Sequence, residues 1–209
     1  MTAGTLIIFA KAPELGRVKT RLIDSLGAQG ALDAHCDLVG LTLRNLGSLA
    51  GVTSQLWTTQ VTQDTQAWAS QFELPHFTQT GKGLGERMHN AIAQTVVPDA
   101  KKRVILVGTD CPVIDAQYVL RAFAELLVSD VVIGPAVDGG YGLIGMSEPH
   151  LGLFTDIAWG SSRVLSQTCD AVRHAGLRVS LLPEIWDVDR EEDWLRYLNF
   201  VERSTDRGQ

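Results

Sequence analysis

Short apolar segments recur along the chain, and glycine, proline or charged residues bound each of them. Apolar runs of this length between such breakers are typical of strands in a buried sheet. The pattern predicts strands at residues 5–10, 54–59, 103–108, 130–136, 141–146 and 177–183.

Segments of helical period separate most of these runs, and they predict helices at residues 28–49, 63–71, 84–97, 115–128, 161–174 and from 190 to near the end of the chain. Alternating strands and helices are typical of an α/β fold, so we expect a mostly parallel sheet between two layers of helices. The segment "GPAVDGGYGLIGM" at residues 134–146 joins two strand-like runs by a glycine-rich turn that is too short for a helical crossover. One antiparallel excursion is therefore expected in the sheet.

The composition limits the number of domains and the class of partner. The 209-residue chain is 45% hydrophobic, which is enough for one substantial core. Because it contains no internal repeat, low-complexity tract or linker-like segment, we expect a single domain over residues 1–209. The formal net charge of −6 argues against non-specific nucleic-acid binding, which depends on an excess of lysine and arginine. Any basic cluster must therefore act locally.

Cysteine spacing and hydropathy bear on the compartment. Cys36, Cys111 and Cys169 contain no CxxC pair, so they indicate neither a disulfide framework nor a zinc site, and a reducing cytoplasm is the simpler expectation. No apolar stretch approaches the ~20 residues that cross a bilayer, and no small-residue cleavage site follows the first apolar run. We expect a cytoplasmic protein without a membrane span, and its oligomeric state is left open.

Four basic side chains follow the first predicted strand within "KAPELGRVKTRL": Lys11, Arg17, Lys19 and Arg21. Ligands of open α/β sheets bind at the carboxyl ends of the strands, so this position predicts a phosphate-binding loop. The alternative is a solvated loop with a basic helix start, which opposes the helix dipole unless an anion is bound. The glycine spacing of a Walker A loop is absent. Lys19 and Arg21 can reach the same phosphate chain only if the segment is irregular there, because a regular helix would turn them about 200° apart.

A carboxylate follows the third predicted strand, in "VILVGTDCP". Asp110 lies at the end of this strand, where Pro112 stops it. Such a carboxylate can hold Mg²⁺ together with substrate phosphate oxygens. Alternatively Asp110 caps the next helix, although Asp115 is the nearer candidate for that cap.

The turn in "GPAVDGGYGLIG" is a candidate contact for a second substrate. Gly139 and Gly140 allow close approach of a ligand to the backbone, and Asp138 and Tyr141 flank them with polar tips. A plain β-turn is an equally good interpretation, because Asp-Gly is itself a strong turn signal.

Two further segments contribute candidates. In "WDVDREEDW", either Asp187 or Asp189 could complete a metal site with Asp110, while Asp189 is also a candidate N-cap for the last helix, with Glu192 completing a capping box. In "TGKGLGERM", the glycines lack the dinucleotide-binding fingerprint, and Arg87 is a candidate ligand contact.

Taken together, "IFAKAPELGRVKTRL", "GTDCP" and "GPAVDGGYGLIG" resemble, in this order and spacing, the bacterial DUF2064 family of GT-A-fold, glycosyltransferase-like proteins. That family is related to the nucleotide-diphospho-sugar transferases and to the molybdenum-cofactor and phospholactate guanylyltransferases. The resemblance covers roughly residues 5–200.

The resemblance implies a GT-A-like, three-layer domain whose first loop cradles the phosphates of a nucleotide. It implies phosphate contacts for the four basic residues of that loop and a metal-binding role for Asp110, with Asp187 or Asp189 as a second ligand. It places Asp138, Gly139, Gly140 and Tyr141 on the acceptor side of the cleft.

These observations lead to three functional hypotheses. The first is an Mg²⁺- or Mn²⁺-dependent transferase that moves the sugar of a nucleotide-diphospho-sugar to an unknown small-molecule acceptor, with Asp138 orienting or deprotonating the acceptor. The second is a nucleotidyltransferase, in which an acceptor phosphate attacks a nucleoside triphosphate and pyrophosphate leaves. The third is a nucleotide-binding protein without catalytic activity.

Overall fold

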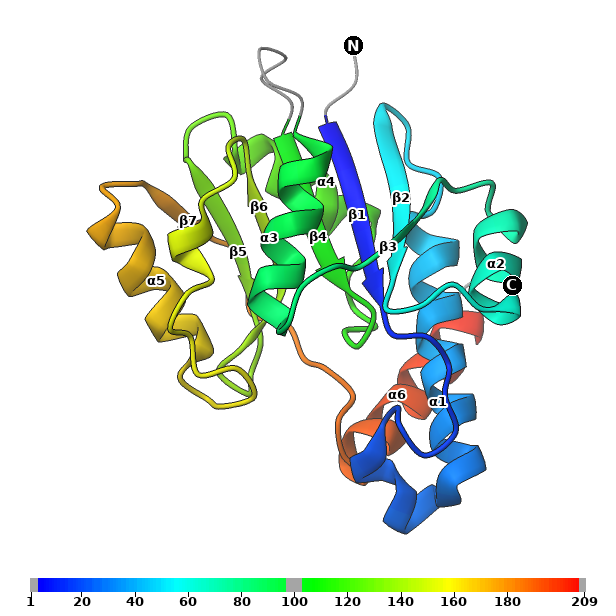
Figure 1. The fold of residues 1–209 in the computed structure, drawn as a ribbon. Coiled ribbons are helices and arrows are strands. Elements are labelled where there is room, and N and C mark those ends of the chain that lie inside the picture. Colours follow the sequence, from blue (N-terminus) through cyan, green and yellow to red (C-terminus); the bar gives the residue numbers. More distant parts are fainter. Residues whose placement is uncertain (1–3, 97–102, 207–209) are drawn as a thin grey trace.

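The computed structural model describes residues 4–96 and 103–206 (Figure 1). Seven strands form one sheet in the order β3-β2-β1-β4-β6-β5-β7. Strand β6 runs antiparallel to both of its neighbours, and all other neighbouring strands are parallel. The expected α/β fold with one antiparallel excursion is therefore confirmed. The strands are β1 (Gly4–Ala10), β2 (Val52–Thr58), β3 (His76–Thr78), β4 (Arg103–Gly108), β5 (Val131–Pro135), β6 (Tyr141–Met146) and β7 (Val179–Leu181).

Helices cover both faces of the sheet. One buried cluster joins the sheet to α1, α2 and α4, and a second joins its other face to α3 and α5, which lie in front of the sheet in Figure 1. Helix α6 packs beside α1 in a smaller cluster. The helices are α1 (Ile23–Leu46), α2 (Gln63–Gln71), α3 (Leu84–Thr95), α4 (Ala116–Glu125), α5 (Val164–His174) and α6 (Glu191–Asp206), with short 3₁₀ helices η1 (Thr20–Leu22) and η2 (Leu151–Leu153).

The apolar run of β1 explains its central place in the sheet. Leu6 and Ile8 are buried in one cluster, and Ile7 and Phe9 are buried in the other. Successive side chains of a strand point to opposite faces, so a strand between two helix layers must be apolar at every position. Burial of each of these side chains stabilises the fold by about 1.5–3 kcal/mol.

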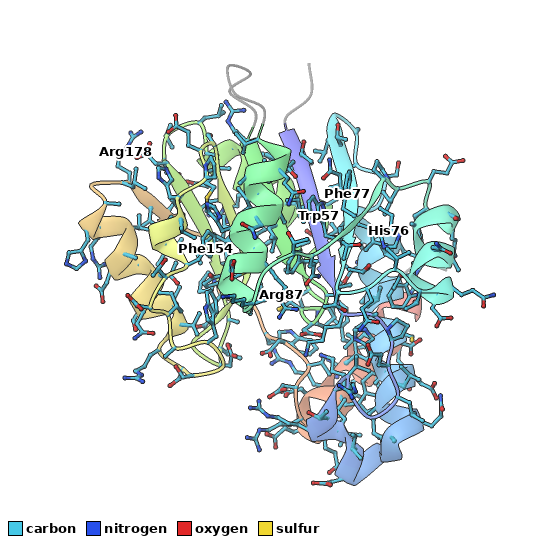
Figure 2. All side chains as sticks on the ribbon, in the orientation of Figure 1. Trp57, His76, Phe77, Arg87, Phe154 and Arg178 are labelled. Atoms are coloured by element: carbon cyan, nitrogen blue, oxygen red, sulfur yellow. The ribbon has the colours of Figure 1, made fainter. Side chains whose placement is uncertain are left out.

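Most predicted elements are present, with two instructive differences. Strand β3 is missing from the predictions, because it is only three residues long and its His76 and Thr78 are polar. It forms the sheet edge beside β2, where Phe77 stacks on Trp57 with ring centroids 4.8 Å apart (Figure 2). Helix α1 begins before residue 28, but it is broken at Gly27 (φ 72°), so its continuous part starts where the sequence predicts. Residue 97 of the predicted 84–97 helix lies outside the described residues.

The topology brings three sequence motifs together at one end of the strands, where β1 and β4 have their carboxyl ends. The parallel strands β1 and β4 end on this side of the sheet, and the antiparallel strand β6 begins there. The basic loop after β1, Asp110 after β4 and the glycine turn before β6 therefore converge. Within the described parts of the chain, no helix is long and apolar enough to cross a membrane.

Candidate functional site

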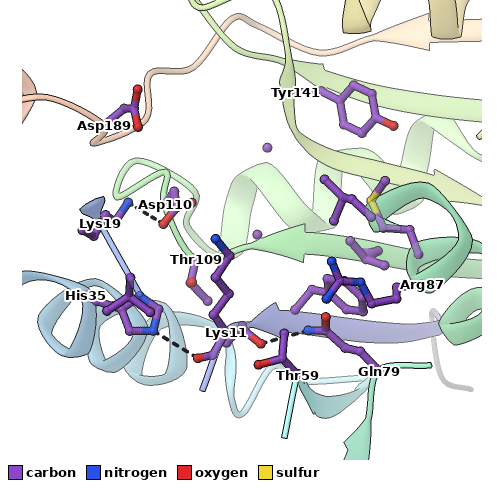
Figure 3. Close-up of a pocket in the computed structure, with 18 of the residues that line it drawn as sticks. Lys11, Lys19, His35, Thr59, Gln79, Arg87, Thr109, Asp110, Tyr141 and Asp189 are labelled. Atoms are coloured by element: carbon purple, nitrogen blue, oxygen red, sulfur yellow. Dashed lines mark hydrogen bonds and ion pairs between the residues drawn. The ribbon is translucent and has the colours of Figure 1, made fainter. Parts of the chain in front are cut away.

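A cavity of about 490 Å³ opens at the carboxyl ends of β1 and β4 (Figure 3). Basic side chains from two segments line it, and we call it the basic cavity. Lys11, Lys19 and Arg21 come from the loop after β1, and Arg87 comes from the first turn of α3 (Figure 2). Arg17 does not line it: its side chain is 79% exposed, and its Nε lies 3.5 Å from Glu14 Oε2.

Lys19 is the most enclosed of these cations, with a side chain only 7% exposed. Its Nζ lies 2.5 Å from Asp110 Oδ1 and donates a 2.6 Å hydrogen bond to the carbonyl oxygen of Val188. The backbone of Lys19 is left-handed (φ 44°, ψ 42°), so no regular helix runs through this position. The irregular segment required for Lys19 and Arg21 to line one cavity is therefore present.

Asp110 follows β4, and its side chain is 57% exposed. Partial removal from water acts to raise the pKa of Asp110, but the charge and hydrogen bond of Lys19 outweigh this and lower it overall. Asp110 also anchors the segment before α6 through its backbone, because its carbonyl oxygen accepts a 2.9 Å hydrogen bond from the Val188 N–H. Asp110, Lys19 and Val188 thus tie three distant segments together.

Asp189 lies at the rim of the basic cavity, where its carboxylate pairs with Arg21. Its hydrogen bond and charge raise the pKa of Arg21. The sequence interpretation of Asp189 as the N-cap of the last helix is wrong. Asp193 Oδ2 instead accepts from the backbone N–H groups of Asp189 and Arg190, at 3.2 and 2.9 Å. Asp193 satisfies these donors from within the first turn of α6, which leaves the Asp189 carboxylate free for Arg21.

A second cavity of about 320 Å³ adjoins the first. The carboxylates of Asp110, Asp138 and Asp187 line it, and we call it the acidic cavity. Asp110 lines both cavities, as do Tyr141 and Gly142. The two cavities therefore adjoin at Asp110 and at these shared residues.

The glycine turn supplies Asp138 and holds it in place. Asp138 Oδ1 accepts a 2.8 Å hydrogen bond from the N–H of Gly140. Gly139 has φ 86°, and a Cβ there would overlap the carbonyl oxygen of Ser162, which precedes α5. Its own carbonyl accepts a 2.9 Å hydrogen bond from Leu165 N–H. The turn thus needs glycine for its own packing, and Gly140 also lines the acidic cavity.

Tyr141 differs from its sequence interpretation as a polar tip beside the turn. Its ring lines both cavities, but its hydroxyl is buried and finds no hydrogen-bond partner among the described residues. Burial raises the pKa of Tyr141. Tyr141 therefore presents ring surface, not its hydroxyl, to a ligand.

Asp187 is the only candidate metal ligand beyond Asp110 that faces the acidic cavity in the described structure. Burial together with the negative charges of Asp138 and Asp110 raises the pKa of Asp187 to about 6. Burial thus contributes most to this shift, and the two neighbouring carboxylates act in the same direction.

Sequence reasoning missed several polar residues of the basic cavity, chiefly Gln79, Thr59 and His35. Gln79 is buried, and its Nε2 donates to the carbonyl oxygens of Ala10 and Trp57 at 2.9 and 3.0 Å. This fixes the amide so that Oε1 points toward the cavity (Figure 3). No motif marks these residues, because they come from three separate elements.

The DUF2064 family model, which describes an uncharacterised protein conserved in bacteria, matches residues 42–161. The match spans more than half of the 209 residues. The chain belongs to the DUF2064 family. No curated protein matches the sequence.

Solved structures share the fold of this DUF2064 protein. A proposed nucleotide-diphospho-sugar transferase from Desulfovibrio desulfuricans G20 is 33% identical, with a TM-score of 0.81 over 91% of this chain and 84% of that one. The 4-diphosphocytidyl-2C-methyl-D-erythritol synthase of Anaerococcus prevotii DSM 20548 is 9% identical (TM-score 0.62; 95% and 97% covered). The inositol-1-phosphate CTP transferase of T. maritima is 12% identical (TM-score 0.57; 90% of each chain covered). The last two likenesses concern the fold alone.

The donor set of this DUF2064 protein fits a hard divalent cation in part. Within residues 4–96 and 103–206, no group of three or more His, Cys, Asp or Glu side chains is arranged to hold a metal ion. Mg²⁺, however, commonly uses one or two carboxylates and completes its shell with water and substrate phosphate. Asp110 and Asp187 offer two carboxylates beside the basic cavity, whereas Asp189 pairs with Arg21.

Proposed function

We propose that this DUF2064 protein is a metal-dependent transferase that binds a nucleotide-diphospho-sugar in the basic cavity and transfers its glycosyl group to an acceptor in the acidic cavity. The observation that carries the proposal is the position of Asp110, which lines a cationic cavity on one side and an acidic cavity on the other. The 33% identical protein from Desulfovibrio desulfuricans G20, described as a proposed nucleotide-diphospho-sugar transferase, supports this assignment.

The basic side chains would bind the diphosphate. Lys11, Arg21 and Arg87 come from two different segments, so they can contact a phosphate chain from more than one side. Arginine forms paired hydrogen bonds with phosphate oxygens, and preorganised cations stabilise the charge that develops on a leaving diphosphate. Lys19 joins this group from its position against Asp110.

The acidic side chains would act on the metal and on the acceptor. Asp110 and Asp187 would hold the divalent cation, which supplies further charge stabilisation for the leaving group. Asp138 would orient the acceptor hydroxyl and take its proton. Its Oδ1 is held by Gly140 N–H, so Oδ2 is the oxygen available for this role.

Nucleotidyl transfer is the second candidate, and the number of cations in the basic cavity favours it. Four basic side chains line this cavity, and they suit a triphosphate at least as well as a diphosphate. The T. maritima protein of similar fold is a CTP transferase by name. In this reaction, the leaving group is pyrophosphate instead of a nucleoside diphosphate.

Analysis of the released phosphates separates the two reactions. The protein is incubated with panels of nucleotide sugars and of nucleoside triphosphates, each with acceptor mixtures and Mg²⁺ or Mn²⁺, and products are identified by ³¹P NMR. We expect a nucleoside diphosphate from a nucleotide sugar, and we expect Asp110→Asn and chelation by EDTA to abolish its release. Asp33→Asn is the matched control, because Asp33 lies outside both cavities and pairs with Gln29. Metal-dependent pyrophosphate release from a triphosphate would replace the first proposal by the second, and nucleotide binding without turnover would favour a non-catalytic protein.

A further inference from the structure

The acidic cavity contains three carboxylates and, among the described residues that line it, no lysine, arginine or histidine. The adjoining basic cavity differs, since four basic side chains line it together with two carboxylates, Asp110 and Asp189. A ligand that carried a phosphate or carboxylate would therefore meet like charges in the acidic cavity. Like charges that lie within a few ångströms of each other repel appreciably near a protein surface, where the effective dielectric constant is lower than in water.

Bound cations reduce this negative charge but leave no excess of positive charge. Lys19 pairs with Asp110 from the side of the basic cavity. With Lys19 counted, one divalent cation held by Asp110 and Asp187 would cancel the two negative charges that remain on the three carboxylates. The cavity becomes about neutral, and the diphosphate of the donor competes for the same cation. An anionic acceptor would still find no cationic side chain of its own.

The walls of the acidic cavity combine aromatic and aliphatic surface with these carboxylates. Trp159 and Tyr141 stand edge to face, with ring centroids 6.2 Å apart, and Leu84, Met88 and Val164 also line the cavity. The indole of Trp159 is held against α3, since a Cβ at Gly85 would lie 2.9 Å from its Nε1. Apolar surface in the same cavity as a few carboxylate acceptors is suited to a small ligand with both C–H surface and hydroxyl donors.

Carboxylates accept hydrogen bonds and cannot donate them when ionised. Asp138 has one oxygen committed to Gly140 N–H and one available. Hydroxyl groups can supply donors to such oxygens, whereas ionised phosphate oxygens offer acceptors only. The charge and the hydrogen-bond chemistry of the cavity thus select the same class of molecule.

From these observations we propose that the acidic cavity takes a hydroxyl-bearing acceptor of the sugar or polyol class that carries no phosphate or carboxylate group. This inference rests on the proposed function, because it names the acceptor class of the same site. It also opposes the nucleotidyl-transfer alternative, in which a phosphate group is the nucleophile.

Matched pairs of probes test the inference: glycerol and glycerol 3-phosphate, glucose and glucose 6-phosphate, and myo-inositol and inositol 1-phosphate. Each probe is added to ¹⁵N-labelled protein that is saturated with nucleotide and Mg²⁺. The indole N–H signal of Trp159 is assigned by its loss in Trp159→Phe and followed during the titration. We expect neutral members to shift this signal and their phosphate esters to leave it unchanged.

Turnover with the same pairs gives a second readout. For an accepted neutral probe, Trp159→Ala should raise the KM for the acceptor about tenfold through loss of ring contact, with the KM for the nucleotide within about twofold of wild type. Trp159→Phe retains an aromatic wall and should recover most of this loss. A merely structural role for Trp159 would change both KM values together and contradict the contact.

The outcomes separate this inference from the proposed function. Nucleotide binding is measured first, by thermal shift, and its absence would overturn the proposed function together with the acceptor class. If nucleotide binds and the phosphate esters are the preferred ligands or substrates, the acceptor class is wrong while the nucleotide site stands. Nucleotide binding without a response to either member of any pair would also overturn the acceptor class.

Discussion

Replacement of Lys19 by methionine tests whether the contact between the basic loop and Asp110 organises the site. Methionine keeps the length and apolar stem of lysine but removes the ammonium group. In Lys19→Met, Asp110 Oδ1 loses its partner at 2.5 Å, and the Val188 carbonyl loses its hydrogen bond at 2.6 Å. Both losses occur where three chain segments meet.

The loss of folding stability in Lys19→Met depends on how exposed Lys19 and Asp110 are. A hydrogen bond from a charged group contributes about 1.5–3 kcal/mol, and the Lys19 side chain that donates it is only 7% exposed. Asp110 is 57% exposed, so the ion pair itself is screened by water and adds only about 0–1 kcal/mol. After the unpaired Asp110 regains hydration, we expect a net loss of about 2 kcal/mol. For a chain of this size, that corresponds to a Tm lowered by about 4–8 °C.

The assay is urea denaturation and thermal unfolding of the free protein in EDTA. Arg17→Met is the matched control, because Arg17 belongs to the same loop but its side chain is 79% exposed. We expect this control to stay within about 0.5 kcal/mol of wild type. Equal stabilities of the two variants would refute the reasoning that Lys19 ties the loop to Asp110.

Three further predictions concern the turn, the pH dependence and the cavities. Gly139→Ala should lose more stability than Gly16→Ala, by at least about 1 kcal/mol in urea denaturation. Both glycines have positive φ, but only at Gly139 would a Cβ collide with the backbone. Equal losses in the two variants would contradict this packing. Burial lowers the pKa of His35, so the folded protein keeps the imidazole neutral at a pH where the unfolded chain already binds a proton. The free energy of unfolding should therefore fall as the pH drops below the unfolded pKa of about 6.5. His35→Gln keeps a donor for the Lys11 carbonyl and should therefore lose less stability than wild type between pH 7.5 and 5, and identical pH slopes would contradict this. Arg87→Ala should weaken nucleoside diphosphate binding about tenfold by titration calorimetry, with Arg163→Ala, outside both cavities, as the unaffected control.

Local patterns were sufficient for the main elements of the fold. Strand β6 and helix α2 have the predicted bounds, because a glycine turn precedes β6 and the Thr62 cap opens α2. Asp115 caps α4 as expected, with its Oδ1 2.8 Å from Tyr118 N. Strand β3 could not be predicted, since its place at the sheet edge depends on pairing with β2 and not on its own three residues.

Most of the charged residues that line the two cavities were named from the sequence, whereas their pairings and the polar residues of the basic cavity were not. The position of Asp110 at a strand end was readable from the sequence, but its contact with Lys19, 91 positions earlier, depends on the topology. Likewise, the sequence suggests Asp189 as the cap of α6, but in the folded chain Asp189 pairs with Arg21, 168 positions earlier, and Asp193 accepts from the backbone N–H of Arg190. The place of Gln79 in the cavity depends on β1 and β2, which provide the two carbonyl oxygens that its amide binds.

Nucleotide binding to the basic cavity is the central claim, and a thermal-shift titration tests it most directly. The protein is titrated with the nucleoside diphosphates of all common bases, with and without Mg²⁺. When its free concentration is one hundred times its dissociation constant, a nucleotide should stabilise the protein by about 2.7 kcal/mol. We expect this stabilisation at lower nucleotide concentrations when Mg²⁺ is present. We expect Lys11→Ala to weaken this stabilisation and Arg17→Ala, outside the cavity, to preserve it. Absence of stabilisation by every nucleotide, or stabilisation that Lys11→Ala and Arg17→Ala reduce equally, would contradict a nucleotide site in the basic cavity.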